Sequence, residues 1–202
     1  MTEATETTTR RHLAPARRWG LVVGVAVAVI ALDRLSKWWA LDRLSGGEVI
    51  DLIGSLRLQL AFNTGMAFSK GSGSGAIIGV VAIGIVAVLV FVARKVDSRV
   101  QLLLIGIVMG GAIGNIVDRV VRVGEVNPFT GETAVGFMSG AVVDFIDLQW
   151  WPVFNIADAA VVCGGLALAV LSARVPADDP SATPEEPETA EPGADESDAP
   201  RS

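Results

Sequence analysis

The chain has 202 residues, of which 51% are hydrophobic, and it carries a formal net charge of −6 with a mean hydropathy of +0.51. This is too apolar for an ordinary soluble domain, and the apolar residues are concentrated in runs. The chain has one cysteine, Cys163, so it cannot form an intrachain disulfide. Its one histidine, His12, lies far from every motif, so the common zinc sites lack ligands and a Ser-His-Asp or Cys-His catalytic site lacks its base. Chemistry must therefore use carboxylates, Lys, Arg, Asn, Ser or backbone groups.

The chain begins with a polar, basic leader, residues 1–18, followed by an apolar run at about 19–41. About 20 apolar residues cross a bilayer core as a helix, so this run qualifies, although Asp33, Arg34 and Lys37 interrupt its end. Asp33 and Lys37 are four positions apart, so they share a helix face and can pair. A salt bridge at a helix end with a snorkelling lysine explains them equally well. The following DRLSKWW has no small-residue cleavage site, which argues against a signal peptide.

The first long loop, 42–74, contains the sequence EVIDLIGSLRLQLAFNTGMAFS (48–69), in which apolar and polar residues alternate. Alternation with period two and several β-branched residues predict short strands. The second long loop, 119–147, offers a partner in residues 120–143, where NPFTGE has the composition of a turn. We therefore expect a small β platform outside the membrane.

The second and third spans are expected at about 75–93 and 100–118, and the second is uncharged. Asn115 and Arg119 share one face at the end of the third span, because they are four positions apart. The third span also carries small residues at helical spacing, which permit the close approach of another helix backbone: Gly106, Gly110 and Gly114, with Gly111 beside them.

The fourth span is expected at about 148–173 and contains Asn155 and Asp158, which are three positions apart and hence neighbours on one helix face. From Asp158 to Ala173 is about 22 Å of helix at 1.5 Å per residue, so Asp158 is expected a few ångströms below the outer membrane interface. A carboxylate near hydrocarbon costs about 3 kcal/mol or more unless it is compensated. A function for this residue is therefore expected.

A second acid, Asp144 of VVDF, precedes this span, and the tryptophans between the two acids, Trp150 and Trp151, resemble an interfacial belt. The two carboxylates can therefore meet at one depth. Two acids at hydrogen-bond distance and partly withdrawn from water cannot both ionise cheaply, so one keeps its proton and the other acts as a base. With a water between them, this is aspartic peptidase chemistry. Three alternatives stay open: a proton or ion pathway in a transporter, acids paired with Arg119 and Lys37 for structure, and a scaffold built on the glycine ridge.

The charges also predict an orientation. Residues 176–202 hold nine acids and one base, so the acidic charge belongs to a tail, 175–202, that we expect to be disordered and cytoplasmic. The rest carries net +2, and basic residues precede the first span, fill the short loop between the second and third spans, and follow the fourth: Arg10, Arg11, Arg17, Arg18, Arg94, Lys95, Arg99 and Arg174. By the positive-inside bias both termini are cytoplasmic, and loops 42–74 and 119–147 face outward.

Five motifs, in order, resemble those of the lipoprotein signal peptidases, or type II signal peptidases: DRLSK (33–37), FNTGMAFS (62–69), GGAIGNIVDR (110–119), VVDF (142–145) and FNIADA (154–159). The resemblance covers residues 19–174 and implies a four-helix α-helical membrane peptidase of the bacterial inner membrane. Such enzymes are aspartic endopeptidases that remove the signal peptide of prolipoproteins, cutting just before a cysteine that carries diacylglycerol. They use no metal or cofactor, and the antibiotic globomycin is expected to occupy the substrate site. The expected partners are lipid-modified prolipoproteins and membrane lipids, with no nucleic acid, and the expected state is a monomer.

By the same resemblance, the catalytic pair is Asp144 and Asp158. The positions that match residues lining or supporting the site are Asp33, Lys37, Asn63, Gly111, Asn115, Arg119, Asn155 and Ala157. The family pattern does not use Asp118 as a catalytic acid, so we expect it to pair with a nearby base, and Asp147 is expected to be peripheral.

Two features lie outside this pattern. The adjacent residues Ser36-Lys37 and Ser69-Lys70 invite comparison with a Ser-Lys dyad, but neighbours on a helix diverge and do not face each other. The stretch from Arg119 to Asp144 is longer than family members usually have, and an inserted hairpin there can act as a lid or as a contact for a partner.

Overall fold

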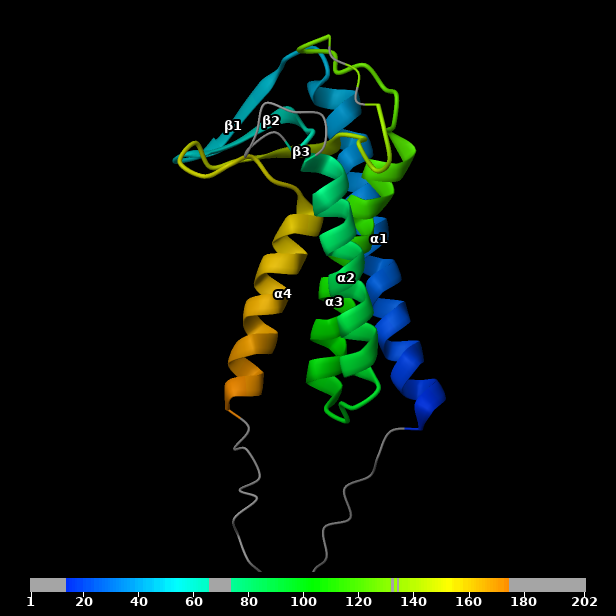
Figure 1. Cartoon of the computed structure of the whole chain (residues 1–202). Helices are drawn as coiled ribbons and strands as arrows, with labels where there is room; N and C mark the ends of the chain where they lie inside the picture. The colour runs from blue at the N-terminus through cyan, green and yellow to red at the C-terminus, as the bar shows by residue number, and fades with distance from the viewer. Residues whose placement is uncertain (1–13, 66–73, 132, 134, 175–202) are drawn as a thin grey trace, which may run out of the picture.

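Four helices and a three-stranded sheet form the structure, a computed structural model that describes residues 14–65, 74–131, 133 and 135–174. Figure 1 shows the helices side by side, with the sheet at one end of the bundle. In chain order the elements are α1 (Pro15–Leu44), β1 (Val49–Ile53), β2 (Leu56–Asn63), α2 (Ser74–Ala93), α3 (Arg99–Val121), β3 (Val142–Asp147) and α4 (Ile156–Ala173). All four helices are long and apolar enough to cross a membrane.

The helix α3 lies at the centre of the bundle and packs against α1, α2 and α4. Its glycines allow this packing, as the small-xxx-small ridge predicted. A Cβ added at Gly110 would lie 2.7 Å from the carbonyl oxygen of Ala26 on α1, and one added at Gly111 would collide with the carbonyl oxygen of Ala157 on α4. The two positions, on different faces of α3, therefore set its distance to two neighbouring helices.

The sheet is antiparallel in the order β1-β2-β3, which confirms a small β platform. Its strand β3 lies beside the segment that enters α4, through a bridge between Ile146 and Phe154. One side of the sheet packs on the end of α1, where Leu44, Leu60 and Phe145 belong to one buried cluster. The platform is therefore held on the bundle both by the chain segment that leads into α4 and by apolar packing against α1.

Two boundaries differ from the sequence-based expectation. The fourth helix begins at Ile156, so the prediction that the span starts at 148 is wrong. Residues 148–155 instead form a loop. Gln149 has a positive φ of 67° in this loop, and Phe154 near its end forms the bridge to Ile146. The predicted strand partner at 120–143 is also largely wrong, because β3 overlaps only its last two residues and the rest holds an isolated bridge between Val126 and Thr133.

The ends of the chain fall outside the described residues, and with them most of the basic leader, His12, the tail 175–202 and the Ser69-Lys70 pair. The first helix begins at Pro15, so the last four residues of the predicted leader are helical. The longer loop predicted between the third and fourth spans is present as residues 122–141, between α3 and β3.

Candidate active site

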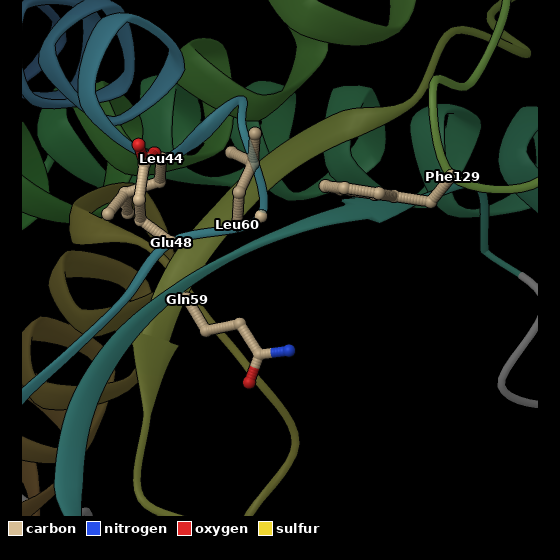
Figure 2. Close-up of a pocket in the computed structure, with 6 residues that line it drawn as sticks. Leu44, Glu48, Gln59, Leu60 and Phe129 are labelled. Carbon is tan, nitrogen blue, oxygen red and sulfur yellow. The ribbon is translucent and has the colours of Figure 1, made fainter.

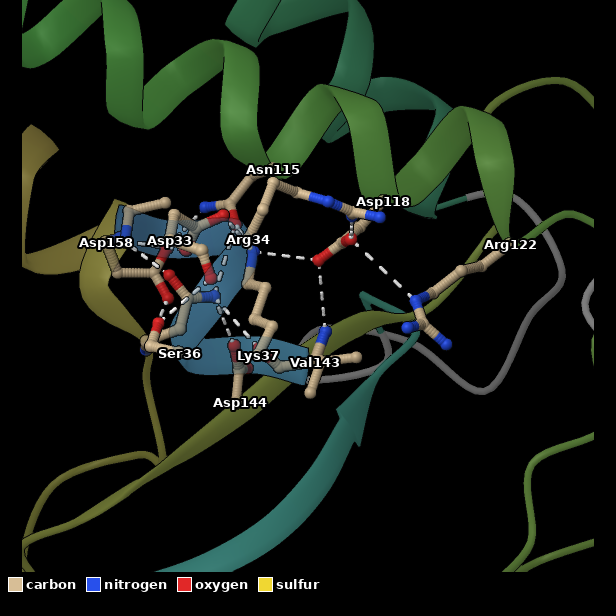
Figure 3. A network of polar contacts seen from close by, with 12 residues as sticks. Asp33, Arg34, Ser36, Lys37, Asn115, Asp118, Arg122, Val143, Asp144 and Asp158 are labelled. Carbon is tan, nitrogen blue, oxygen red and sulfur yellow. Dashed lines mark hydrogen bonds and ion pairs between the residues drawn. The ribbon is translucent and has the colours of Figure 1, made fainter. Parts of the chain in front are cut away.

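Polar side chains from α1, α3, β3 and the start of α4 meet where the sheet joins the bundle. Figure 3 shows carboxylates, a lysine and an asparagine from these four elements pointing toward one another. The predicted residues within this cluster are Asp33, Lys37, Asn115, Arg119, Asp144, Asn155, Ala157 and Asp158. Segments more than 100 residues apart in the chain thus contribute to one site.

The start of α4 places Asp158. Asn155 is the N-cap, and its side-chain oxygen accepts a hydrogen bond from the Asp158 N–H at 2.9 Å. In return Asp158 Oδ2 accepts a hydrogen bond from the Asn155 N–H at 3.2 Å, which completes a capping box. The three-residue spacing predicted a shared helix face, and the structure shows this reciprocal cap instead. A carboxylate at this position is stabilised by the unpaired N–H groups and the positive end of the helix dipole.

Two asparagine amides connect the two candidate catalytic acids. Asn155 Nδ2 donates to Asp144 Oδ1 at 2.6 Å, and Asn115 Nδ2 donates to Asp158 Oδ1 at 2.7 Å. The amides are themselves joined, because Asn155 Nδ2 also lies 3.1 Å from Asn115 Oδ1. The two carboxylates therefore lie at opposite ends of one short hydrogen-bonded chain.

The environment of Asp144 favours its protonated form. Asp144 is only 1% exposed. Burial, and to a lesser extent the negative charge of Asp158, raises the pKa of Asp144 to about 7. Hydrogen bonds from Asn155 and Asn63 and the charge of Lys37 act in the opposite direction but do not offset burial. Near neutral pH, Asp144 therefore holds its proton about half of the time.

The Lys37 ammonium is buried and satisfied by three acceptors. It lies 2.8 Å from Asp33 Oδ2, 2.8 Å from Asp118 Oδ2 and 3.1 Å from Asn115 Oδ1. The predicted pairing of Asp33 with Lys37 is thus present. Because an ammonium has three N–H donors, none is left for a nucleophile, and Lys37 fixes charge and geometry beside the acids.

Asp33 also ties α1 to the first turn of α4. Its Oδ1 accepts a hydrogen bond from the Ala157 N–H at 3.1 Å. A helix N-terminus has N–H groups without partners inside the helix, so a carboxylate from a neighbouring helix satisfies one of them. Ser36 Oγ donates to the Asp33 carbonyl oxygen at 2.9 Å, so Ser36 has no free hydroxyl directed at Lys37 as a dyad would require.

Asp118 is a second buried acid that holds several elements together, whereas the sequence predicted only that it pairs with a nearby base. It lies 2.5 Å from Arg34 and 2.8 Å from Lys37, and its Oδ2 accepts a weak hydrogen bond from the Val143 N–H at 3.4 Å. It therefore connects α3 to the strand that carries Asp144. Arg34 gave no sequence signal for this contact, because the two residues are 84 positions apart.

Asp147 lies at the other end of β3 and pairs with Arg57 on β2 at 2.7 Å. The hydrogen bond from Arg57 holds the pKa of Asp147 below its usual value. This carboxyl is therefore ionised and paired away from the candidate site, in line with its expected peripheral role.

Arg119 has an unmatched donor beside the acids. The residue is 3% exposed, and its Nη1 has no hydrogen-bond partner within the described part of the chain. The charges of Asp144 and Asp158 both act on it. A buried N–H without a partner is costly and needs an explanation, and a ligand oxygen would satisfy it.

Asn63 lies at the edge of the site. It ends β2 opposite Val142, and its side chain hydrogen-bonds to Asp144 while its Oδ1 accepts from the Gly65 N–H at 2.9 Å. Asn63 is exposed, so it can contact both the acid and an incoming chain.

A separate pocket of about 110 Å³ opens between the end of α1 and the sheet, lined by Leu44, Gly47, Glu48, Gln59, Leu60 and Phe129 (Figure 2). Neither acid of the pair lines it, so it is not the candidate catalytic site. The described residues also contain no group of three His, Cys, Asp or Glu side chains that could hold a metal ion.

Comparisons with known proteins identify the family. The model of the signal peptidase (SPase) II family matches residues 25–174. The chain belongs to this family. It is 40% identical over 153 residues to the lipoprotein signal peptidase of Rhodococcus jostii, covering 75% of this chain and 72% of that relative. It is 38% identical over 160 residues to that of Mycobacterium tuberculosis, covering 79% and 74%.

A solved bacterial membrane enzyme has the same fold, with a TM-score of 0.60 and 26% identity over 77% of this chain and 93% of that one. The resemblance read from the five motifs is thus confirmed, as is the four-helix membrane fold with a small sheet. Lipoprotein signal peptidases cleave signal peptides from prolipoproteins, so this chain is a bacterial membrane peptidase, and the transporter and scaffold interpretations are set aside.

Proposed function

We propose that Asp144 and Asp158 are the catalytic pair of this signal peptidase, and that it cuts prolipoproteins directly before the diacylglyceryl-modified cysteine. The observation that carries the assignment is the hydrogen-bonded amide chain from Asp144 through Asn155 and Asn115 to Asp158. It holds two acids of unlike environment together. One is buried with a pKa raised to about 7, and the other is half-buried at a helix N-terminus.

The proposed reaction divides the work between the acids. Ionised Asp158 takes a proton from a water molecule, whose oxygen attacks the carbonyl carbon of the scissile bond. Protonated Asp144 gives its proton to the carbonyl oxygen, which yields a neutral tetrahedral intermediate. When the C–N bond breaks, the proton on Asp158 passes to the leaving amine and the hydroxyl proton returns to Asp144. Both acids then have their starting protonation states, and no metal or covalent intermediate is required.

The remaining predicted residues support this step. The unmatched donor of Arg119 and the exposed amide of Asn63 are placed to bind substrate carbonyl oxygens. Lys37 and Asp33 fix the charge and position of the first turn of α4. Gly111 and Ala157 set the distance between α3 and α4, on which the distance between Asn115 and Asp158 depends.

We further propose that the end of the bundle without the sheet is cytoplasmic. In this arrangement Arg18, in the first turn of α1, and Arg94, directly after α2, lie together there, since Arg18 donates to the Arg94 carbonyl oxygen at 2.6 Å. Clustered basic residues favour the cytoplasmic side. The site then faces outward, where prolipoproteins emerge. Because one chain supplies every proposed site residue, we propose that a monomer is active, with residues 19–174 as the peptidase domain.

The test is the release of the signal peptide from a diacylglyceryl prolipoprotein by the purified full chain. Asp144→Asn and Asp158→Asn are expected to insert and fold but to release no signal peptide, because each variant removes either the acid or the base. Asp51→Asn is the matched control, an exposed carboxylate on β1. Normal release by either catalytic variant, in preparations where the control is also normal, rejects the assignment.

A further inference from the structure

The outer part of the sheet has one apolar row and one charged row. The strand pairing aligns Ile50, Leu58 and Ile146 across the three strands, and the next row aligns Asp51, Arg57 and Asp147. Residues paired directly across strands point to the same side, and successive residues point to opposite sides. The apolar row, which we call the apolar stripe, therefore lies on one face of the sheet, and the charged row lies on the other. Ile50 is exposed, whereas Leu58 and Ile146 are half-buried and also pack against the apolar cluster at the end of α1.

The apolar stripe is on the face that carries a catalytic acid. Ile146 and Asp144 are two residues apart on β3, so their side chains point to the same side. Arg57 and Asp147 are paired with each other on the opposite face at 2.7 Å. Contact of the apolar face with lipid would therefore not remove an ion pair from water.

The stripe begins at the level where α4 enters the membrane. Ile146 is bridged to Phe154, two residues before α4 starts at Ile156. The 18 residues of α4 span about 27 Å at 1.5 Å per residue, close to the bilayer core of about 30 Å. Ile156 therefore lies near one surface of the hydrocarbon. Strands lie about 4.8 Å apart, so the stripe extends about 10 Å from β3 to β1, and Figure 1 shows the sheet projecting sideways from the bundle on the side of α4.

The tip of the sheet continues this apolar surface. Ile53, the last residue of β1, is 79% exposed, and Trp150 is 72% exposed. The turn after Ile53 is joined to the segment that carries Trp150, because Gln149 Nε2 donates to the Ser55 carbonyl oxygen at 3.0 Å. Exposed large apolar side chains that form a contiguous group indicate an interaction surface, and tryptophans are typical of the membrane interface.

From these placements we infer that the apolar stripe and the tip contact the bilayer leaflet on the sheet's side of the membrane, with lipid as the partner. The helix α4 also presents apolar side chains to its surroundings, since Val162 and Leu166 are exposed. The sheet and α4 are then both positioned relative to the same membrane surface. This holds the strand of Asp144 at the same level as the helix end that carries Asp158.

Two residues that are adjacent in β1 provide a matched test. In the full chain with Cys163→Ser, Ile50→Cys and Asp51→Cys are each labelled with an environment-sensitive fluorophore and reconstituted in phospholipid vesicles. Because the two side chains lie on opposite faces, the label at position 50 is expected to show a blue-shifted emission, quenching by spin-labelled lipid and little quenching by aqueous iodide. The label at position 51 is expected to show the reverse.

A second pair uses positions that are more exposed than Ile50, which is 38% exposed, so that a label disturbs packing less. Ile53→Cys at the tip and Val135→Cys in the loop between α3 and β3 are both highly exposed, at 79% and 73%. Only the label at position 53 is expected to be in lipid. The inference requires lipid contact at both 50 and 53, so a label at either position that is as accessible to iodide as its control overturns it. Neither result depends on which residues are catalytic.

Discussion

Replacing Asp144 by Asn is expected to stabilise the protein at neutral pH while it removes activity. Asn has nearly the same shape, and its carbonyl oxygen can still accept the hydrogen bond that Asn155 donates. What changes is the charge. The pKa of Asp144 is raised from 3.8 to about 7 in the folded chain, mainly by burial. The folded state therefore keeps a proton that the unfolded state loses between these two values.

The sign and size follow from linkage. Stability from this group is fully present below pH 3.8 and falls as the pH rises to about 7, because only the unfolded chain ionises freely in that window. One pKa unit corresponds to 1.36 kcal/mol, so the loss reaches about 4 kcal/mol above pH 7. Asp144→Asn does not ionise and escapes this loss. The variant should match the wild type near pH 4 and exceed it by up to about 4 kcal/mol at pH 8.

The assay is thermal unfolding in detergent from pH 4 to pH 8, followed by tryptophan fluorescence. Asp51→Asn serves as the control, because Asp51 is exposed and its replacement should leave the pH dependence unchanged. A constant difference between Asp144→Asn and the wild type across this range would refute the reasoning, since a packing change has no reason to follow pH. So would a variant that is less stable than the wild type at pH 8.

Three other predictions use the same geometry. The kcat/KM of the wild type should fall above about pH 7 by about tenfold per pH unit, as Asp144 loses the proton it donates, which a pH series of signal-peptide release measures. Lys37→Met leaves Asp33 buried without its cation, while Asp118 keeps Arg34, so it should cost about 3–5 kcal/mol in the free energy of unfolding, measured by denaturant titration. Gly111→Ala should push α4 away at the Ala157 carbonyl, costing about 1–3 kcal/mol and lowering kcat. Gly165→Ala, where an added Cβ meets nothing within 4 Å, is its control, and equal effects of the two substitutions would contradict the close-contact argument.

Local patterns predicted much of this fold. Apolar runs of membrane length identified four helices, and alternation identified the strands of the first loop, because both signals depend only on near neighbours in the chain. The pairing of Asp33 with Lys37 was equally readable, since the two residues lie on one helix face. The glycines of α3 likewise indicated close packing, although not which helix each would meet.

The start of α4 was missed because WWPVF is as apolar as a membrane span. The capping box of Asn155 and Asp158 was present as a signal, and it could have placed the helix start correctly. Contacts between distant segments gave no such signal. The convergence of Arg34 and Lys37 on Asp118, and the hydrogen bond from Ala157 to Asp33, arise only when α1, α3 and α4 pack together. The five motifs indicated which residues belong to the site, but the amide chain that joins the two acids required the structure.

The most direct test of the catalytic pair is a comparison of signal-peptide release by Asp144→Asn, Asp158→Asn and the double variant on one diacylglyceryl prolipoprotein. If the acids act as one unit, the losses are not additive, and all three variants should release signal peptide at the same background rate. A double variant that is slower than either single variant by the product of their separate effects would mean that the two carboxylates work independently. Release by the double variant at the wild-type rate would mean that they are not the catalytic acids.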